Sequence, residues 1–226
     1  VMNTIVGMLI VLGVAVLSLF KGSEFITSIL VVPEISTMLE AEKLSALIAC
    51  GTLIITIFGI GLTCTTISSI SLEGTNLWIK KTLPVSEKEI FKAKIISNLI
   101  LTIPAAILSN IIFYMALKFD VIYLMLNIII TIVFSVLNAV LGLLINVYFP
   151  KLDWSNPTVV VKQSAAVFIG IVVTFASIAL PIAVFLLLKV ENILMFLSFL
   201  AIIFLAVAFI AWNILMTKGV KQFKML

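Results

Sequence analysis

The chain has 226 residues, of which 63% are hydrophobic and 11% are charged, with a formal net charge of +4. A soluble domain of this length needs far more polar surface around its core, so the composition excludes a soluble globular protein and indicates an integral membrane protein. The small net charge also argues against nucleic-acid binding. With no histidine and two cysteines, the chain is not expected to hold zinc or haem, and we expect no cofactor.

Six uncharged runs are each long enough to cross a bilayer core of about 30 Å. They lie at residues 4–20, 44–70, 95–117, 121–149, 163–188 and 192–217. Lipid offers no hydrogen-bond partners to the backbone, so each run is expected to be an α-helix, and none shows the alternation of a β-barrel strand. The prediction is an all-α polytopic protein with six transmembrane helices in one domain, residues 1–226.

The lysines predict how this domain is oriented. Ten of the fourteen follow the second and fourth runs or lie in the C-terminal tail, and four lie on the opposite side. Because cytoplasmic loops carry the excess of basic residues, the ten-lysine side is expected to be cytoplasmic, with both termini on that side.

None of the six runs contains a lysine or a carboxylate. Carriers driven by protons or sodium ions usually need such groups within the membrane, so this pattern argues against them. The runs do contain amide side chains, among them Asn98, Asn110, Asn127, Asn138 and Asn146. Two interpretations stay open for these residues: hydrogen bonds between helices, or, for the first four, the lining of a transport path.

A charged segment, residues 71–94, separates the second run from the third. The second helix is expected to continue to Leu83, where Pro84 ends it. Ser86 and Glu89 match a capping box, which predicts a new helix that continues into the third run. The sequence thus predicts a cytoplasmic helical elbow. Its Trp78 suits either a protein contact or an anchor in lipid headgroups, and both interpretations stay open.

A second cytoplasmic segment, residues 149–162, is expected to be an ordered loop. Two prolines restrict its backbone, and a tryptophan offers a large face to bury. It either supports the elbow or an ATPase, or forms a turn anchored in headgroups. The residues on which this interpretation depends are Lys151, Asp153, Trp154 and Lys162.

Two stretches resemble a known family. SLEGTNLWIKKTLPVSEKEIFKAKIISNLIL (residues 71–101) and FPKLDWSNPTVVVKQSAAV (residues 149–167) are similar to sequences in bacterial permease subunits of ABC-2 type ATP-binding-cassette exporters. The resemblance implies a multi-pass protein of the bacterial inner membrane. It also implies that the elbow is the coupling helix that docks on the ATPase subunit. By position, that role falls on Glu73, Asn76, Trp78, Lys80 and Lys81, and the apolar Leu77 beside them is expected to join the same contact.

The expected function is therefore the permease part of an exporter that forms the translocation path. No G-x-x-x-x-G-K-[ST] motif is present, so the chain is not expected to be an enzyme, and ATP hydrolysis would belong to a partner subunit. The other expected partners are membrane lipid and a second permease copy or homologous half. The family usually has an amphipathic helix before the first span, and related permeases are often longer, so the chain can also correspond to their C-terminal half. The alternative is an energy-independent membrane protein, such as a channel, scaffold or assembly factor.

Overall fold

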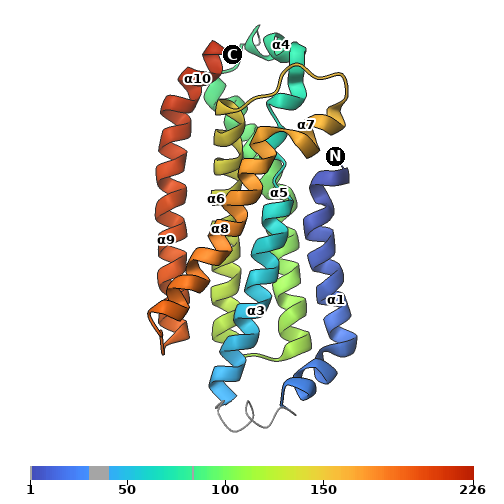
Figure 1. Ribbon diagram of the computed structural model, residues 1–226, viewed down its shortest axis with the longest axis vertical. Helices are drawn as coiled ribbons and strands as arrows, with labels where there is room; N and C mark the ends of the chain where they lie inside the picture. Colours follow the sequence, from blue (N-terminus) through green and yellow to red (C-terminus); the bar gives the residue numbers. More distant parts are fainter. Residues whose placement is uncertain (1, 31–40, 83) are drawn as a thin grey trace.

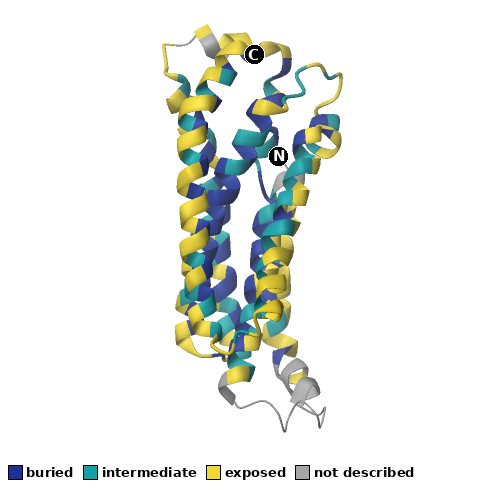
Figure 2. Ribbon diagram, turned by 60° about the vertical axis from the view of Figure 1, so that its left-hand side comes forward, coloured by how far each residue is buried: buried dark blue, intermediate teal, exposed yellow. Residues whose placement is uncertain are grey.

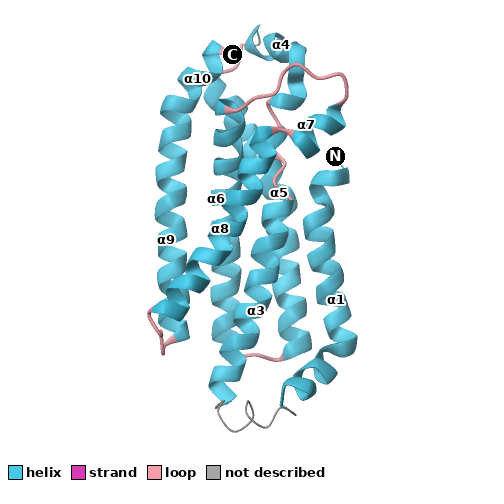
Figure 3. Ribbon diagram, viewed as in Figure 1, coloured by secondary structure: helices cyan, strands magenta, loops and turns pink. Residues whose placement is uncertain are grey.

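The computed structural model describes residues 2–30, 41–82 and 84–226. Within these residues every regular element is a helix (Figure 3). The long helices are α1 (Met2–Leu30), α3 (Ala41–Leu62), α5 (Glu87–Leu117), α6 (Val121–Tyr148), α8 (Ala165–Leu187) and α9 (Ile193–Ile214). In the described chain, six helical stretches are long and apolar enough to cross a membrane. The predicted all-α architecture with six spans is confirmed.

The helices run up and down in one bundle (Figure 1). We call the end that carries α4 (Leu77–Thr82), α7 (Pro157–Gln163) and α10 (Val220–Met225) the elbow end. The opposite end, with the short turns after α5 and α8, is the loop end. The marked N- and C-termini both lie toward the elbow end, as an even number of spans requires.

Burial is distributed unevenly over the bundle. In α6, fifteen of twenty-eight residues are buried, because it packs against α3, α5 and α9. In α8, all of whose residues are described, only Ala166 and Thr174 of twenty-three are buried. The outward faces of the helices are largely exposed (Figure 2), and they carry large apolar side chains such as Leu17, Phe168 and Leu187. Such a surface is suited to lipid.

The expectation that the second span continues as an α-helix toward Leu83 is wrong. The helix α3 ends at Leu62, and the chain continues through two 3₁₀ segments, η1 (Thr66–Ser68) and η2 (Ser71–Asn76), before α4. Serine and threonine hydroxyls in this stretch compete for backbone groups. Thr63 Oγ1 donates to Gly59 O at 2.8 Å, and Thr66 Oγ1 donates to Ala139 O of α6 at 2.8 Å. These contacts draw the segment onto α6 in place of a projecting helix.

The second limb of the elbow forms as predicted. Ser86 is the N-cap of α5, and its Oγ accepts a hydrogen bond from Glu89 N at 3.3 Å. The Glu89 carboxylate in turn accepts from Ser86 N at 3.0 Å, which completes the capping box. The helix then runs for 31 residues to Leu117, a length of about 46 Å that exceeds the bilayer core.

Candidate functional site: the elbow junction

The elbow end is fastened to the bundle by a set of buried polar contacts that we call the elbow junction. It comprises residues 63–76 of the η1–η2 segment, Asn146 at the end of α6, Lys94 of α5 and the loop 149–156. Asn146 is fully buried. Its Oδ1 accepts hydrogen bonds from Ile70 N at 2.8 Å and Ser71 N at 3.1 Å, and its Nδ2 donates to Ser71 Oγ at 2.7 Å. One amide therefore fixes the start of η2.

The loop 149–156 holds the same serine from the other side. Lys151 N donates to Ser71 Oγ at 2.9 Å, and Trp154 Nε1 donates to Ser71 O at 2.7 Å. Gly74 lies against the indole with φ +53°, and a Cβ there would stand 3.0 Å from Trp154 Nε1. A side chain at this position would meet both an unfavourable backbone conformation and the indole ring. The loop is ordered and supports the elbow, as the first of its two interpretations predicts.

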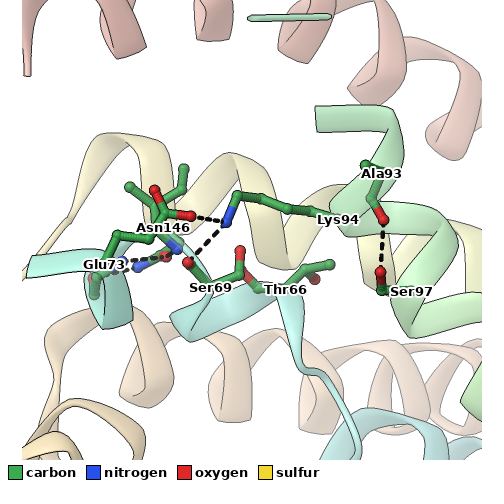
Figure 4. Close-up of polar contacts among 9 residues, drawn as sticks. Thr66, Ser69, Glu73, Ala93, Lys94, Ser97 and Asn146 are labelled. Atoms are coloured by element: carbon green, nitrogen blue, oxygen red, sulfur yellow. Dashed lines mark hydrogen bonds and ion pairs between the residues drawn. The ribbon is translucent and has the colours of Figure 1, made fainter. Parts of the chain in front are cut away.

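An ion pair joins the elbow to α5. Lys94 Nζ lies 2.5 Å from Glu73 Oε1 and donates to Ser69 O at 2.9 Å (Figure 4). The two side chains are 12% and 10% exposed. Charges so far removed from water are costly unless they are paired, so this contact specifies where η2 sits on α5.

The outward face of the elbow is apolar. Trp78 is 63% exposed and Ile79 is 46% exposed, and Asn76 is exposed beside them. The backbones of Lys80 and Lys81 lie in α4, and their side chains are outside the described part. The junction thus carries a small, accessible hydrophobic patch, which we define as Trp78 and Ile79.

Two residues expected at the ATPase contact lie elsewhere. Leu77 is 4% exposed and packs in the cluster that contains Phe91 and Phe223. The Glu73 carboxylate is in the ion pair with Lys94. The interpretation of Leu77 as a surface contact is wrong, because its side chain is buried in this apolar cluster while that of Trp78 is exposed. Glu73 serves an internal contact of the junction.

The second predicted loop divides into two parts. Lys151 and Trp154 are partly buried and contact Ser71, whereas Asp153 and Lys162 are exposed. From residue 157 the chain is the helix α7, which begins at its N-cap, Asn156. The sequence could not indicate α7 because seven residues are too few for a periodic pattern.

The four asparagines for which a path-lining role stayed open lie at helix interfaces. Asn98 Nδ2 donates to Thr63 O at 3.0 Å, Asn127 Nδ2 donates to Ala49 O at 2.9 Å, and Asn138 Nδ2 donates to Ile60 O at 3.0 Å. Each of these bonds reaches from α5 or α6 to α3 or the residue just after it. Asn110 donates to Ala106 O in its own helix, at 2.8 Å. All four are at most 8% exposed. The geometry favours the inter-helix interpretation over the path-lining one.

The sequence predicted only part of what holds the junction together. Asn146 was expected to bond between helices, but not to hold the elbow, and Ser71 and Lys94 were not singled out, although the junction depends on them. The signal for Lys94 was weak, because it is one of several lysines directly before an apolar run. Among the described residues no group of His, Cys, Asp and Glu could hold a metal ion. The junction is suited to a mechanical role, because Asn146, Ser71, Lys94 and Glu73 are engaged with one another and with the backbone around them.

Together, the fold and the junction define a polytopic, all-α membrane protein. It has six helices long and apolar enough to span a membrane, and an elbow at one end that buried polar contacts fasten to the bundle. No protein-family model matches the chain, and no curated protein or solved structure matches it either.

Proposed function

We propose that the chain is the transmembrane permease subunit of an ATP-binding-cassette exporter of the ABC-2 type, driven by a separate ATPase subunit that docks on the elbow. The observation that carries the proposal is the contrast within the elbow. Its base is fixed by buried bonds to α5, α6 and the loop 149–156, while Trp78 and Ile79 stay exposed. An exposed tryptophan on a rigid support is typical of a protein-contact hot spot.

The rigidity has a mechanical consequence. Movement of α4 would be transmitted to α5 through the Lys94–Glu73 ion pair and to α6 through Asn146. From the junction, α5 runs across the bundle to Leu117, and α6 runs back across it from Val121 to Tyr148. A partner that changes shape on hydrolysing ATP would therefore move spanning helices by moving the elbow. This suits a permease that has no ATPase motif of its own.

The proposal places the protein in a bacterial inner membrane, with the elbow end on the cytoplasmic side. We expect a thiol reagent that cannot cross the membrane to label Lys118→Cys, at the exposed loop end, in intact cells. Lys88→Cys, exposed at the elbow end, is the matched control and should be labelled only after permeabilisation. Both are made with Cys50 and Cys64 replaced by alanine. The reverse pattern would invert the topology and remove the proposed docking site from the cytoplasm.

The docking proposal is tested by Trp78→Ala. The chain is purified from its native membranes, and the amount of nucleotide-binding subunit that co-purifies is measured. Loss of a hot-spot tryptophan should cost about 2 kcal/mol, which lowers the association constant about thirtyfold. Hydrolysis by the complex should also lose its coupling to transport. The matched control is Phe209→Ala, which removes a 68% exposed aromatic side chain from the spanning part of α9.

The two variants separate the proposal from its alternative. If both variants retain the partner and transport equally well, Trp78 is a lipid anchor. The exporter proposal would then rest on the sequence resemblance alone. If no ATPase subunit co-purifies with the unmodified chain, the alternative holds, namely an energy-independent membrane protein such as a channel, scaffold or assembly factor. Equal thermal stability of the two variants shows that any difference comes from docking and not from folding.

A further inference from the structure

The helices α8 and α9 follow each other in the chain but do not pack along their length. They meet near their connecting turn, where the rings of Phe185 and Phe196 lie 5.3 Å apart, and they separate toward the elbow end (Figure 1). Leu137 and Leu141 of α6 line the space between them. The result is a groove of about 880 Å³, a volume within the range of small-molecule binding sites.

The lining of this groove is almost entirely aliphatic and aromatic. The polar side chains among its described lining residues are Ser177 and Asn192. The Ser177 hydroxyl donates to Val173 O in its own helix at 2.8 Å. Asn192 lies at the loop end of the groove, where it caps α9. The length of the groove can therefore hold a hydrocarbon chain and offers little to a polar ligand.

A second, polar pocket adjoins the groove at the loop end. Its volume is about 270 Å³, and Lys43, Tyr123, Glu191 and Asn192 line it. Asn192 borders both spaces. An apolar groove inside the span thus ends at a polar pocket at the membrane boundary, and this arrangement matches the chain and headgroup of a membrane lipid.

The charges of the pocket indicate which headgroup it suits. Its described lining residues include one ammonium group, Lys43, and one carboxylate, Glu191. A headgroup with a phosphate and an amine can complement both, whereas an anionic headgroup would meet the Glu191 carboxylate. We propose that the groove and pocket bind one zwitterionic phospholipid of the loop-end leaflet, with an acyl chain between α8 and α9 and its headgroup against Lys43 and Glu191. The proposal does not depend on the exporter function.

Native mass spectrometry of the full chain tests this site. The protein is released from bilayers that contain equal amounts of phosphatidylethanolamine and phosphatidylglycerol, and retained lipid is identified. One phosphatidylethanolamine per chain is expected. Ala176→Phe places a ring in the groove and should abolish retention. Ala183→Phe is the matched control, because Ala183 lies on the same helix, is exposed and lines neither space; it should retain the lipid.

A second variant tests the polar pocket without changing a residue that lines the groove. Glu191→Lys changes an exposed residue and should shift the lipid preference toward phosphatidylglycerol about tenfold, on the scale by which added basic charge attracts anionic lipid. Three results would overturn the proposal: no retained lipid, equal retention of both lipids by the unmodified chain, or equal loss in the Ala176 and Ala183 variants. A lipid-free dimer that Ala176→Phe dissociates would instead show that a second copy fills the groove.

Discussion

The elbow junction and the α8–α9 groove lie in the same bundle but are held together by different forces. In the junction, Ser71 and Asn146 share directional hydrogen bonds, and Lys94 is paired with Glu73. In the groove, the contacts are apolar, and α8 buries two of its twenty-three residues. The directional hydrogen bonds of the junction hold it in one geometry. The apolar contacts of the groove do not require any particular geometry.

The difference follows from the solvent. Between helices in a bilayer there is no hydrophobic driving force, because lipid tails are as apolar as leucine. Apolar faces such as that of α8 can exchange protein neighbours for lipid at little cost. Buried amides and charges cannot exchange their protein partners for lipid tails, because a polar group without a hydrogen bond in an apolar environment is costly. The polar residues therefore mark the part of this protein whose contacts are directional, and α8, with two buried residues, marks the part whose contacts are mainly apolar.

The variant with the largest expected effect on the elbow junction is Asn146→Ala. The variant leaves the backbone N–H groups of Ile70 and Ser71 buried without their acceptor. We expect the free energy of unfolding to fall by about 4 kcal/mol, from two unsatisfied donors at roughly 1–3 kcal/mol each. Unfolding in mixed micelles measures the change.

The control for this variant is Asn213→Ala on α9. Asn213 is exposed, and its Nδ2 donates to Phe209 O in its own helix. Its loss should change the free energy of unfolding by less than about 0.5 kcal/mol. If the two asparagine variants lose the same stability, the elbow junction is no more specifically held than the lipid-facing helices.

A smaller effect is expected from Lys94→Met. The methionine keeps most of the side-chain volume and removes the Lys94 ammonium group from beside the largely buried Glu73 carboxylate. We expect a loss of about 3 kcal/mol in the free energy of unfolding, at the lower end of the range for breaking a buried ion pair. The same unfolding assay applies.

The double variant Lys94→Met, Glu73→Gln sharpens this result. Removing both charges leaves no uncompensated ion, so the double variant should be more stable than Lys94→Met alone. Additive losses would contradict the coupling between the two side chains and would mean that η2 is positioned by other contacts.

The sequence predicted the parts of this molecule that repeat a simple pattern. Long uncharged runs predicted the six spans, and Ser86 with Glu89 predicted the start of α5. The sequence did not predict that the chain leaves the α-helix after Leu62, because that depends on Thr66 meeting α6 through Ala139 O, 73 residues away. The burial of Leu77 was missed for the same reason. Contacts between distant residues decide which side of the elbow faces outward, and no local pattern records them.

We propose that Trp78 contacts a protein partner and not lipid. The most direct measurement replaces Trp78 with a photo-reactive phenylalanine analogue, irradiates native membranes and identifies the cross-linked product by mass spectrometry. The same analogue at Phe209 is the lipid-facing reference. We predict a covalent adduct with the mass of the nucleotide-binding subunit from position 78 and none from position 209. Lipid adducts alone from both positions would contradict the claim.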